Sequence, residues 1–321
     1  MKASILLPVY NAAHTIQDAL DSIFNQTFTD FNVVIINDGS TDKSEDIIKS
    51  YTDKRILYYS NENNKGLIYT LNRGLDLCKG EYIIRMDADD IMMPTRIEKQ
   101  VFYMDNHPQI VASGTSIICF DNIHRNKLYT PPLSPEEINY KILLGSPLLH
   151  PTSIIRKKII DHYNIKFNEN YKHAEDYKFW YDLLQYGELA NLKEPLLKYR
   201  LSPTQISSRH QNEQLIVSLK VRKEIITNTL QKQGISYPNS FSISTIQKIK
   251  KTFPSNSLYS TILFLFLMSL SDYNIKTLIW FIYSKLYIQK GFSYKYTAAL
   301  FLKILNPNKL QKFNLNLLNF Q

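Results

Sequence analysis

The chain has 321 residues, of which 44% are hydrophobic and 21% charged, as in a globular protein of one large domain or two smaller ones. Its two cysteines, Cys78 and Cys119, exclude a disulfide framework and lack metal-site spacing, which favours the cytoplasm. The formal net charge of +9 is uneven, because the segment from Leu215 onward holds 14 Lys and Arg but only 2 acidic residues. Such a basic tail predicts an anionic partner, either nucleic acid or phospholipid.

The first residues predict a strand rather than a signal peptide, because the apolar run from Ser4 to Tyr10 is too short for a signal sequence. Buried strands then alternate with amphipathic helices. Apolar, β-branched runs predict strands over 4–10, 31–36, 56–60 and 81–84. Helical spacing predicts helices over 15–25, from a cap at Thr41 or Asp42, and over 66–78. This order predicts an α/β fold with a mostly parallel, doubly wound sheet.

The pattern is more mixed after residue 110. It predicts strands at 117–120 and 153–156, and a strong helix from about Ala174 to Tyr186 that Gly187 closes. After Arg209 helical periodicity replaces the turn residues, so we expect a domain boundary near residue 210. The predicted domains are an α/β domain over 1–210 and a basic, amphipathic helical region over 211–321.

Two apolar stretches stand out in the predicted helical region. Leu258–Leu270 is shorter than the roughly 20 residues that a membrane-spanning helix needs. Together with 276–288 it predicts a helical hairpin, whose mixture of Tyr, Phe, Trp and Lys suits a membrane interface. The alternative is an ordinary helical subdomain packed against the α/β domain.

The most informative stretch is the acidic run Met86-Asp87-Ala88-Asp89-Asp90, which follows the apolar strand at 81–84. Three carboxylates in four residues repel one another unless a positive charge neutralises them. A hard divalent cation, Mg²⁺ or Mn²⁺, suits carboxylate oxygens and often bridges to substrate phosphates. The alternative is a solvated loop in which Asp90 is the N-cap of the next helix and Pro94 lies in its first turn.

A second polar sequence, Asn37-Asp38-Gly39, closes the strand at 31–36. In open α/β sheets, ligands gather at the carboxyl ends of parallel strands. Because both this sequence and the acidic run follow such strands, we expect them to face one ligand.

Five motifs in this order resemble the family 2 nucleotide-sugar glycosyltransferases of the GT-A fold, over roughly residues 3–210. They are Pro8-Val9-Tyr10-Asn11, Asn37-Asp38-Gly39-Ser40-Thr41-Asp42, Asn63-Asn64-Lys65-Gly66-Leu67, Asp87-Ala88-Asp89-Asp90 and Glu175-Asp176. The sequences around 171–180, 189–191 and 198–208 are similar to bacterial lipooligosaccharide β-1,3-N-acetylgalactosaminyl/galactosyltransferases of the Haemophilus type.

The resemblance implies an inverting, metal-dependent transfer of a hexose or N-acetylhexosamine from a UDP-sugar to a lipooligosaccharide, O-antigen or capsule glycan. Asp89 is then the ligand of Mn²⁺ or Mg²⁺, and Asp176 is the general base that takes the proton of the acceptor hydroxyl. The remaining nucleotide-binding residues are implied to be Pro8, Tyr10, Asn11, Asp38, Asp87 and Arg200.

Each of these roles has a structural alternative. Asp38, proposed to accept from the uracil N3–H, is also a turn-stabilising residue type. Glu175 and Asp176 also suit a helix N-terminus, where negative charge is favoured. Arg200 is placed by the resemblance near the diphosphate, and an exposed arginine on the surface is the equal alternative. His150 could line the acceptor site, but a structural role is the stronger interpretation.

One position departs from the family pattern, which often has Ala-Arg-Asn in the helix after Asn-x-Gly. Here the residues are Thr70-Leu71-Asn72, followed by Arg73. The basic contact to the nucleotide is therefore lost or displaced by one residue, which is about 100° around a helix.

Two other classes of function are weaker. A sugar-phosphate nucleotidyltransferase also uses acidic metal ligands, but the chain lacks a Gly-rich sequence with Arg and Lys after its first strand. A nucleic-acid-binding protein would use the basic tail, whose basic residues are instead interleaved with Leu, Ile and Phe at helical spacing. We therefore expect no nucleic-acid partner, a lipid-linked acceptor, and a cytoplasmic enzyme in peripheral contact with the anionic inner face of the membrane.

Overall fold

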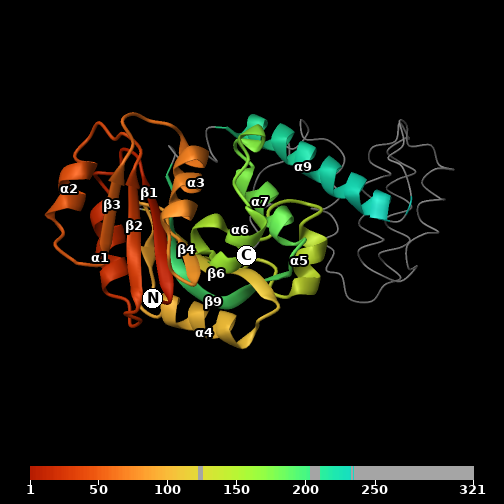
Figure 1. Cartoon of the computed structure of the whole chain (residues 1–321), viewed down its shortest axis with the longest axis horizontal. Helices are drawn as coiled ribbons and strands as arrows, with labels where there is room; N and C mark the ends of the chain where they lie inside the picture. The colour runs from red at the N-terminus through yellow and green to blue at the C-terminus, as the bar shows by residue number, and fades with distance from the viewer. Residues whose placement is uncertain (122–125, 203–209, 233, 235–321) are drawn as a thin grey trace. The chain divides into compact units, whose positions relative to one another are not determined.

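The computed structural model of the chain describes residues 1–121, 126–202, 210–232 and 234. By its contacts the chain divides into two units, Met1–Val221 and Arg222–Gln321. All the predicted site residues belong to the first unit, whose sheet and helices appear in Figure 1. The boundary predicted near residue 210 stays a prediction.

The N-terminal half of the sheet is parallel, as predicted. Its strands β1 (Ala3–Val9), β2 (Phe31–Asn37), β3 (Ile56–Ser60) and β4 (Tyr82–Arg85) lie side by side in the order β3-β2-β1-β4. The connections contain α1 (Ile16–Phe24), α2 (Ser44–Ser50) and α3 (Leu67–Leu77). Figure 1 shows α1 and α2 on one side of these strands and α3 on the other, since right-handed crossovers change face when the strand order reverses.

The other half of the sheet mixes directions. The strand β8 (Ile154–Arg156) is antiparallel to both β4 and β6 (Ile110–Phe120). The strand β9 (Glu188–Arg200) runs parallel to β6 and antiparallel to the short β5 (Ile91–Met92), and β7 (Lys127–Tyr129) is antiparallel to β6. The predicted strand 117–120 is only the end of β6. The sequence did not predict the first part of β6, because Ser113, Gly114 and Thr115 are small or polar.

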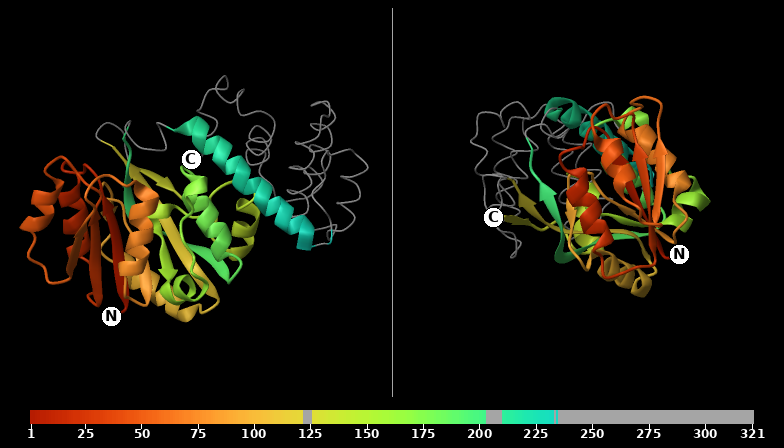
Figure 2. Two further views of the ribbon diagram at one scale, coloured as in Figure 1. Left: turned by 45° about the horizontal axis from the view of Figure 1, so that its top comes forward. Right: turned by 90° about the vertical axis from the view of Figure 1, so that its left-hand side faces the viewer.

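The described residues form five further helices. They are α4 (Arg96–Asn106), α5 (Pro135–Lys141), α6 (Lys157–Tyr163), α7 (Glu175–Leu183) and α9 (Gln211–Lys232), with single 3₁₀ turns at His150–Thr152 and Glu169–Tyr171. Figure 2 shows the same elements from two further directions.

The core forms where helices cover both faces of the parallel strands. All seven residues of β1 and of β2 are buried, as is usual for parallel strands between two helical layers. Ile16, Leu20 and Ile23 of α1 are fully buried against this sheet, at the spacing of one helix face. A rigid core therefore fixes the strand ends that bear the polar sequences.

Three details of the predicted elements were wrong. The helix α2 begins after Lys43, and Asp42 lies outside it, accepting hydrogen bonds from the backbone N–H groups of Ser44 and Ala13 (both 2.9 Å). The helix α7 ends at Leu183 rather than Tyr186, and Gly187 instead packs against the backbone of Gln109. The N-cap of α4 is Thr95, so Asp90 caps no helix.

Most of the predicted helical region, including 258–270 and 276–288, lies outside the described residues. In the part of the chain that the structure describes, none of the helices has the length and apolar character needed to cross a membrane.

Candidate active site

The acidic run leaves β4 as a compact cluster of three carboxylates. Asp87, Asp89 and Asp90 each offer an oxygen within 4.8 Å of the other two. Burial, with the charge of Asp87, raises the pKa of Asp89 to about 6, and the same causes raise the pKa of Asp90 well above its usual value. One oxygen of Asp90, Oδ2, is buried and has no hydrogen-bond partner. Burial and mutual repulsion therefore disfavour the charged forms of Asp89 and Asp90.

The donor set fits a hard divalent cation. Carboxylate oxygens are the ligands that Mg²⁺ and Mn²⁺ prefer, and a bound cation would stabilise the charged forms of Asp89 and Asp90, whose pKa values burial and the charge of Asp87 raise. Asp89, as predicted, and its neighbour Asp87 are the residues that would hold the ion, since both are only half-buried, whereas Asp90 is fully buried.

Arg85, the last residue of β4, is a buried cation that the sequence analysis missed. Its side chain forms an ion pair with Asp87, and only 3% of the residue is exposed. A charged residue ending an otherwise apolar strand could have drawn attention to it. Burial raises the pKa of Asp89, Asp90, Glu175 and Asp176, and the positive charge of Arg85 offsets part of this rise in all four.

Replacing Arg85 with Met is expected to lower the free energy of unfolding by about 3 kcal/mol, because it leaves neighbouring carboxylates without their buried counter-charge. Urea denaturation measures this change. Lys99→Met is a matched control, since it removes an exposed ion pair to Glu194 and should change stability by less than about 1 kcal/mol. Equal losses in the two variants would contradict the role of Arg85.

Arg200, at the end of β9, lies against the acidic run. Its backbone N–H donates to Asp90 Oδ1 (2.9 Å), and its Nε donates to the backbone oxygen of Asp89 (2.8 Å). Its Nη2 forms an ion pair with Asp18 of α1 at 2.8 Å. The structure therefore brings Arg200 together with the predicted metal-binding residues, and contradicts its interpretation as a freely exposed arginine.

Asp38 is buried at the end of β2 and organises the loop before α3. Its Oδ1 accepts from Asn61 Nδ2 (2.6 Å) and from the backbone N–H of Lys65 (2.9 Å), while Oδ2 accepts from the backbone N–H of Gly66 (2.9 Å). A carboxylate has about four acceptor positions, so one remains for a ligand. Asp38 thus supports a loop distant in sequence rather than its own turn, and its contact with uracil stays a prediction.

Gly39 allows this loop to approach β2 closely. Its φ is 67°, and a Cβ there would lie 2.5 Å from the backbone carbon of Asn63. Because any side chain would push the loop away, glycine is required at this position.

The displaced Arg73 joins the same network. Its Nη1 donates to the backbone oxygen of Ser60 (2.8 Å) and to the side-chain oxygen of Asn61, the residue that donates to Asp38. The basic group is therefore not lost, because Arg73 supports Asp38 through Asn61. Asn72 instead exchanges two hydrogen bonds with the backbone of Phe167, at 2.8 and 2.9 Å.

The end of β1 lies between these two groups, because β1 pairs with both β2 and β4. Pro8 is the buried penultimate position of β1, and Tyr10 is 49% exposed just beyond it. Asn11, with a φ of 47°, accepts from the Thr41 backbone N–H at 2.8 Å, which ties the β1 end to the β2 loop. All three lie at the carboxyl end of β1, and their contacts with a nucleotide stay predictions.

Glu175 and Asp176 begin α7. Asp176 accepts from Ser146 Oγ (3.1 Å) and from the Tyr177 backbone N–H (2.7 Å), and burial raises its pKa. Burial and the charge of Asp176 raise the pKa of Glu175 to about 7, and its Oε2 is buried without a hydrogen-bond partner. A raised carboxyl pKa suits a group that must accept a proton near neutral pH.

His150 is packed as a core residue. Its ring contacts Phe167 (centroids 5.3 Å apart) and the edge of Trp180 (5.9 Å), and its Nε2 is buried without a partner. Burial, with the charge of Arg85, holds its pKa well below the usual value, so the ring is neutral. The aromatic packing favours the structural interpretation of His150.

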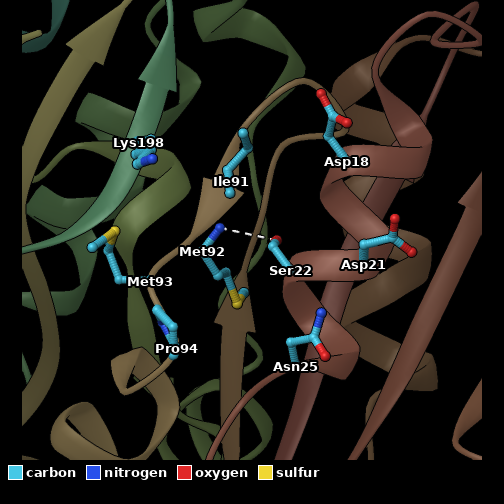
Figure 3. A pocket seen from close by; sticks show the side chains of 9 residues that line it. All are labelled: Asp18, Asp21, Ser22, Asn25, Ile91, Met92, Met93, Pro94 and Lys198. Carbon is cyan, nitrogen blue, oxygen red and sulfur yellow. Dashed lines mark hydrogen bonds between the residues drawn. The ribbon is translucent and has the colours of Figure 1, made fainter.

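A separate hollow lies between α1 and the β5 segment, as Figure 3 shows. Its lining includes Asp18, Asp21, Met92 and Lys198, and the Met92 backbone N–H donates to Ser22 Oγ at 3.0 Å. None of the predicted nucleotide-binding, metal-binding or catalytic residues lines it.

The chain is similar to known proteins in sequence and in structure. The family model described as "Glycosyl transferase family 2" matches residues 4–164. An uncharacterized glycosyltransferase of Haemophilus influenzae is 37% identical over 294 residues, covering 87% of this chain and 90% of its own length. The amylovoran biosynthesis glycosyltransferase AmsE of Erwinia amylovora is 31% identical over 212 residues, covering 64% of this chain and 79% of its own.

A further relative has a named reaction. The Escherichia coli protein WfgD, called UDP-Glc:alpha-D-GlcNAc-diphosphoundecaprenol beta-1,3-glucosyltransferase, is 27% identical over 208 residues, covering 64% of this chain and 79% of its own length.

Solved structures share the fold at low identity. Residues 1–349 of S. aureus TarS in complex with UDP-GlcNAc align with a TM-score of 0.59 and 16% identity, over 97% of this chain and 92% of that one. The mannosyltransferase PcManGT of Pyrobaculum calidifontis, in complex with GDP-Man and Mn²⁺, aligns with a TM-score of 0.52 and 14% identity, over 98% and 88%. The predicted GT-A fold is thus confirmed.

Proposed function

Because the chain belongs to glycosyltransferase family 2 and is a glycosyltransferase, we propose that it moves a hexose or N-acetylhexosamine from a UDP-sugar to a bacterial surface glycan. The convergence of Asp87, Asp89 and Asp90 at the end of β4 carries this proposal, since it creates a demand for a cation beside a predicted nucleotide site. Asp38 and the β1 end supply the nucleotide side, and Arg200 supplies positive charge near the diphosphate.

Transfer requires the acceptor hydroxyl to lose its proton while its oxygen attacks the anomeric carbon. Asp176 takes that proton at a carboxylate oxygen, and Ser146 and the Tyr177 N–H hold its orientation. The acceptor oxygen attacks from the face opposite the diphosphate, and the bond between the anomeric carbon and the diphosphate breaks with its electrons leaving on the diphosphate. This in-line attack inverts the anomeric centre, so an α-linked donor gives a β-linked product. A bound Mn²⁺ or Mg²⁺ at Asp89 would supply positive charge for that leaving group.

The acceptor is proposed to be a lipid-linked oligosaccharide. The name of WfgD, which acts on a diphosphoundecaprenol-linked sugar, supports the lipid link. The name of AmsE, which refers to amylovoran biosynthesis, supports a glycan product. A sugar-phosphate nucleotidyltransferase and a nucleic-acid-binding protein lose support, because the family is one of glycosyl transfer.

The donor is tested by following nucleotide release from UDP-Glc, UDP-Gal, UDP-GlcNAc, UDP-GalNAc, GDP-Man and a dTDP-sugar, each with Mn²⁺, Mg²⁺ or chelator. We expect UDP release from one UDP-sugar, more than about tenfold faster with metal than with chelator. Release from GDP-Man alone would contradict the uridine assignment. Release that chelator leaves unchanged would contradict the metal assignment.

The basic tail is proposed to hold the enzyme at the inner face of the membrane, since each Lys or Arg near an anionic surface contributes about 1 kcal/mol. We expect the full-length protein to sediment with anionic phospholipid vesicles at 50 mM salt and to be released at 500 mM, because salt screens this attraction. Vesicles of zwitterionic lipid are the control. Equal binding to both kinds of vesicle would contradict an electrostatic contact.

A further inference from the structure

A second group of metal-ligating side chains lies where the start of α9 meets the turn before α7. His173, His210 and Glu213 each offer a ligand atom within 4.8 Å of the other two. All three belong to the unit Met1–Val221 and none is part of the acidic run. The function proposed above does not use them.

One carboxylate oxygen lies between the two imidazoles. Glu213 Oε2 is 3.4 Å from His173 Nε2, and the same oxygen contacts His210 Nδ1. Tetrahedral zinc with ligand bonds of about 2.0–2.1 Å places neighbouring ligand atoms about 3.3 Å apart. The spacing observed between His173 and Glu213 matches one edge of such a site, whereas Glu213 and His210 are in direct contact and must separate to admit an ion.

The two imidazole rings lie face to face. Their centroids are 4.3 Å apart and their planes differ by 13°. The stacked rings therefore place both imidazoles beside the carboxylate of Glu213.

The backbone of His173 is also specialised. Its φ is 73°, a left-handed conformation that is uncommon outside glycine, and it lies two residues before Glu175. The ring of His173 stacks on His210 just before α9, and such backbone strain persists where the surrounding contacts require it.

We propose that His173, His210 and Glu213 bind a zinc-class transition metal ion with three protein ligands and one open position. Two imidazoles and a carboxylate suit Zn²⁺, whereas the all-oxygen acidic run suits Mg²⁺ or Mn²⁺. The chain thus has two cation sites of different chemistry. The zinc-class ion ties the start of α9 to the turn that precedes Asp176.

The test uses the full-length protein without a histidine tag, stripped of metal and titrated with Zn²⁺ by calorimetry and with Co²⁺ by visible absorption. We expect one tight Zn²⁺ equivalent and the intense absorption of four-coordinate Co²⁺. We expect Zn²⁺ binding to weaken by at least about tenfold in each of the variants His173→Asn, His210→Gln and Glu213→Gln. Tenfold is the lower limit because removing a residue that only supports a metal ligand already costs about that much. Asn is chosen at 173 because it tolerates the left-handed backbone.

Two controls make the result specific. His162→Gln removes another exposed imidazole and should leave Zn²⁺ affinity unchanged. Asp89→Asn should also leave it unchanged, because that residue belongs to the acidic run. Zn²⁺ affinity unaltered by Glu213→Gln and His210→Gln would overturn the proposal, as would its loss in Asp89→Asn. The readout is binding alone, so it does not depend on sugar transfer.

Discussion

Replacing Asp176 with Asn is expected to lower kcat for sugar transfer by about 10³-fold, because an amide cannot accept the proton of the acceptor hydroxyl. The affinity for UDP with metal should stay within about twofold of the wild type, since the carboxylate serves the acceptor side of the reaction and not the nucleotide. Steady-state kinetics with the donor that the panel identifies, together with calorimetric titration of UDP, measure both quantities.

Two comparisons sharpen this experiment. Asp161→Asn removes an exposed carboxylate paired with Lys157 and is a matched control, which should keep full activity. Glu175→Gln tests the neighbouring acid, whose pKa of about 7 leaves it partly protonated at neutral pH. If Glu175→Gln loses transfer and Asp176→Asn does not, the general base is Glu175 and the assignment of Asp176 is wrong.

Replacing Asp89 with Asn is expected to lower the rate of sugar transfer without lowering the stability of the protein. Metal-dependent transfer should fall by at least about 10²-fold, because the principal carboxylate ligand of the cation is lost. The free energy of unfolding in metal-free buffer should stay equal or rise at pH 7. Burial and the charge of Asp87 raise the pKa of this carboxyl to about 6, so its charged form is disfavoured in the folded protein and its removal relieves repulsion.

The measurements are transfer rates over a range of Mn²⁺ concentrations and urea denaturation in chelator. Asp76→Asn, which removes an exposed partner of Lys166, is the control for a charge change on the surface. A loss of stability in Asp89→Asn equal to its loss of activity, both in kcal/mol, would mean that the residue is structural. Unchanged transfer would place the metal elsewhere.

The parallel half of the fold could be predicted because its signals are local. Each of β1, β2 and β4 is a continuous apolar run, and the intervening helices repeat apolar residues on one face. The mixed half was harder to predict, because β6 buries Ser113 and Thr115 and pairs with β9 far along the chain. Such pairings depend on tertiary contacts that no sequence window contains.

The sequence likewise predicted only some of the residues of the candidate site. The carboxylates of the acidic run were found from their crowding, which is visible in the sequence. Arg85 was missed because a single charged residue at a strand end has no periodic signature, and its burial depends on the surrounding sheet. The hydrogen bond from Asn61 to Asp38 was missed for a similar reason, since the two residues are 23 positions apart in the sequence.

The hydrogen bond from the Arg200 backbone to Asp90 has a consequence for folding during synthesis, because it joins residues 110 apart in sequence. The strands β1 to β4 leave the ribosome first and can pair among themselves, as N-terminal segments generally do. Asp90 gains its backbone donor only when β9 has been made and has paired with β6, a non-local and therefore slow step. A nascent chain that ends before residue 200 can hold the Asp38 network, whereas its acidic run still lacks the strand that completes it.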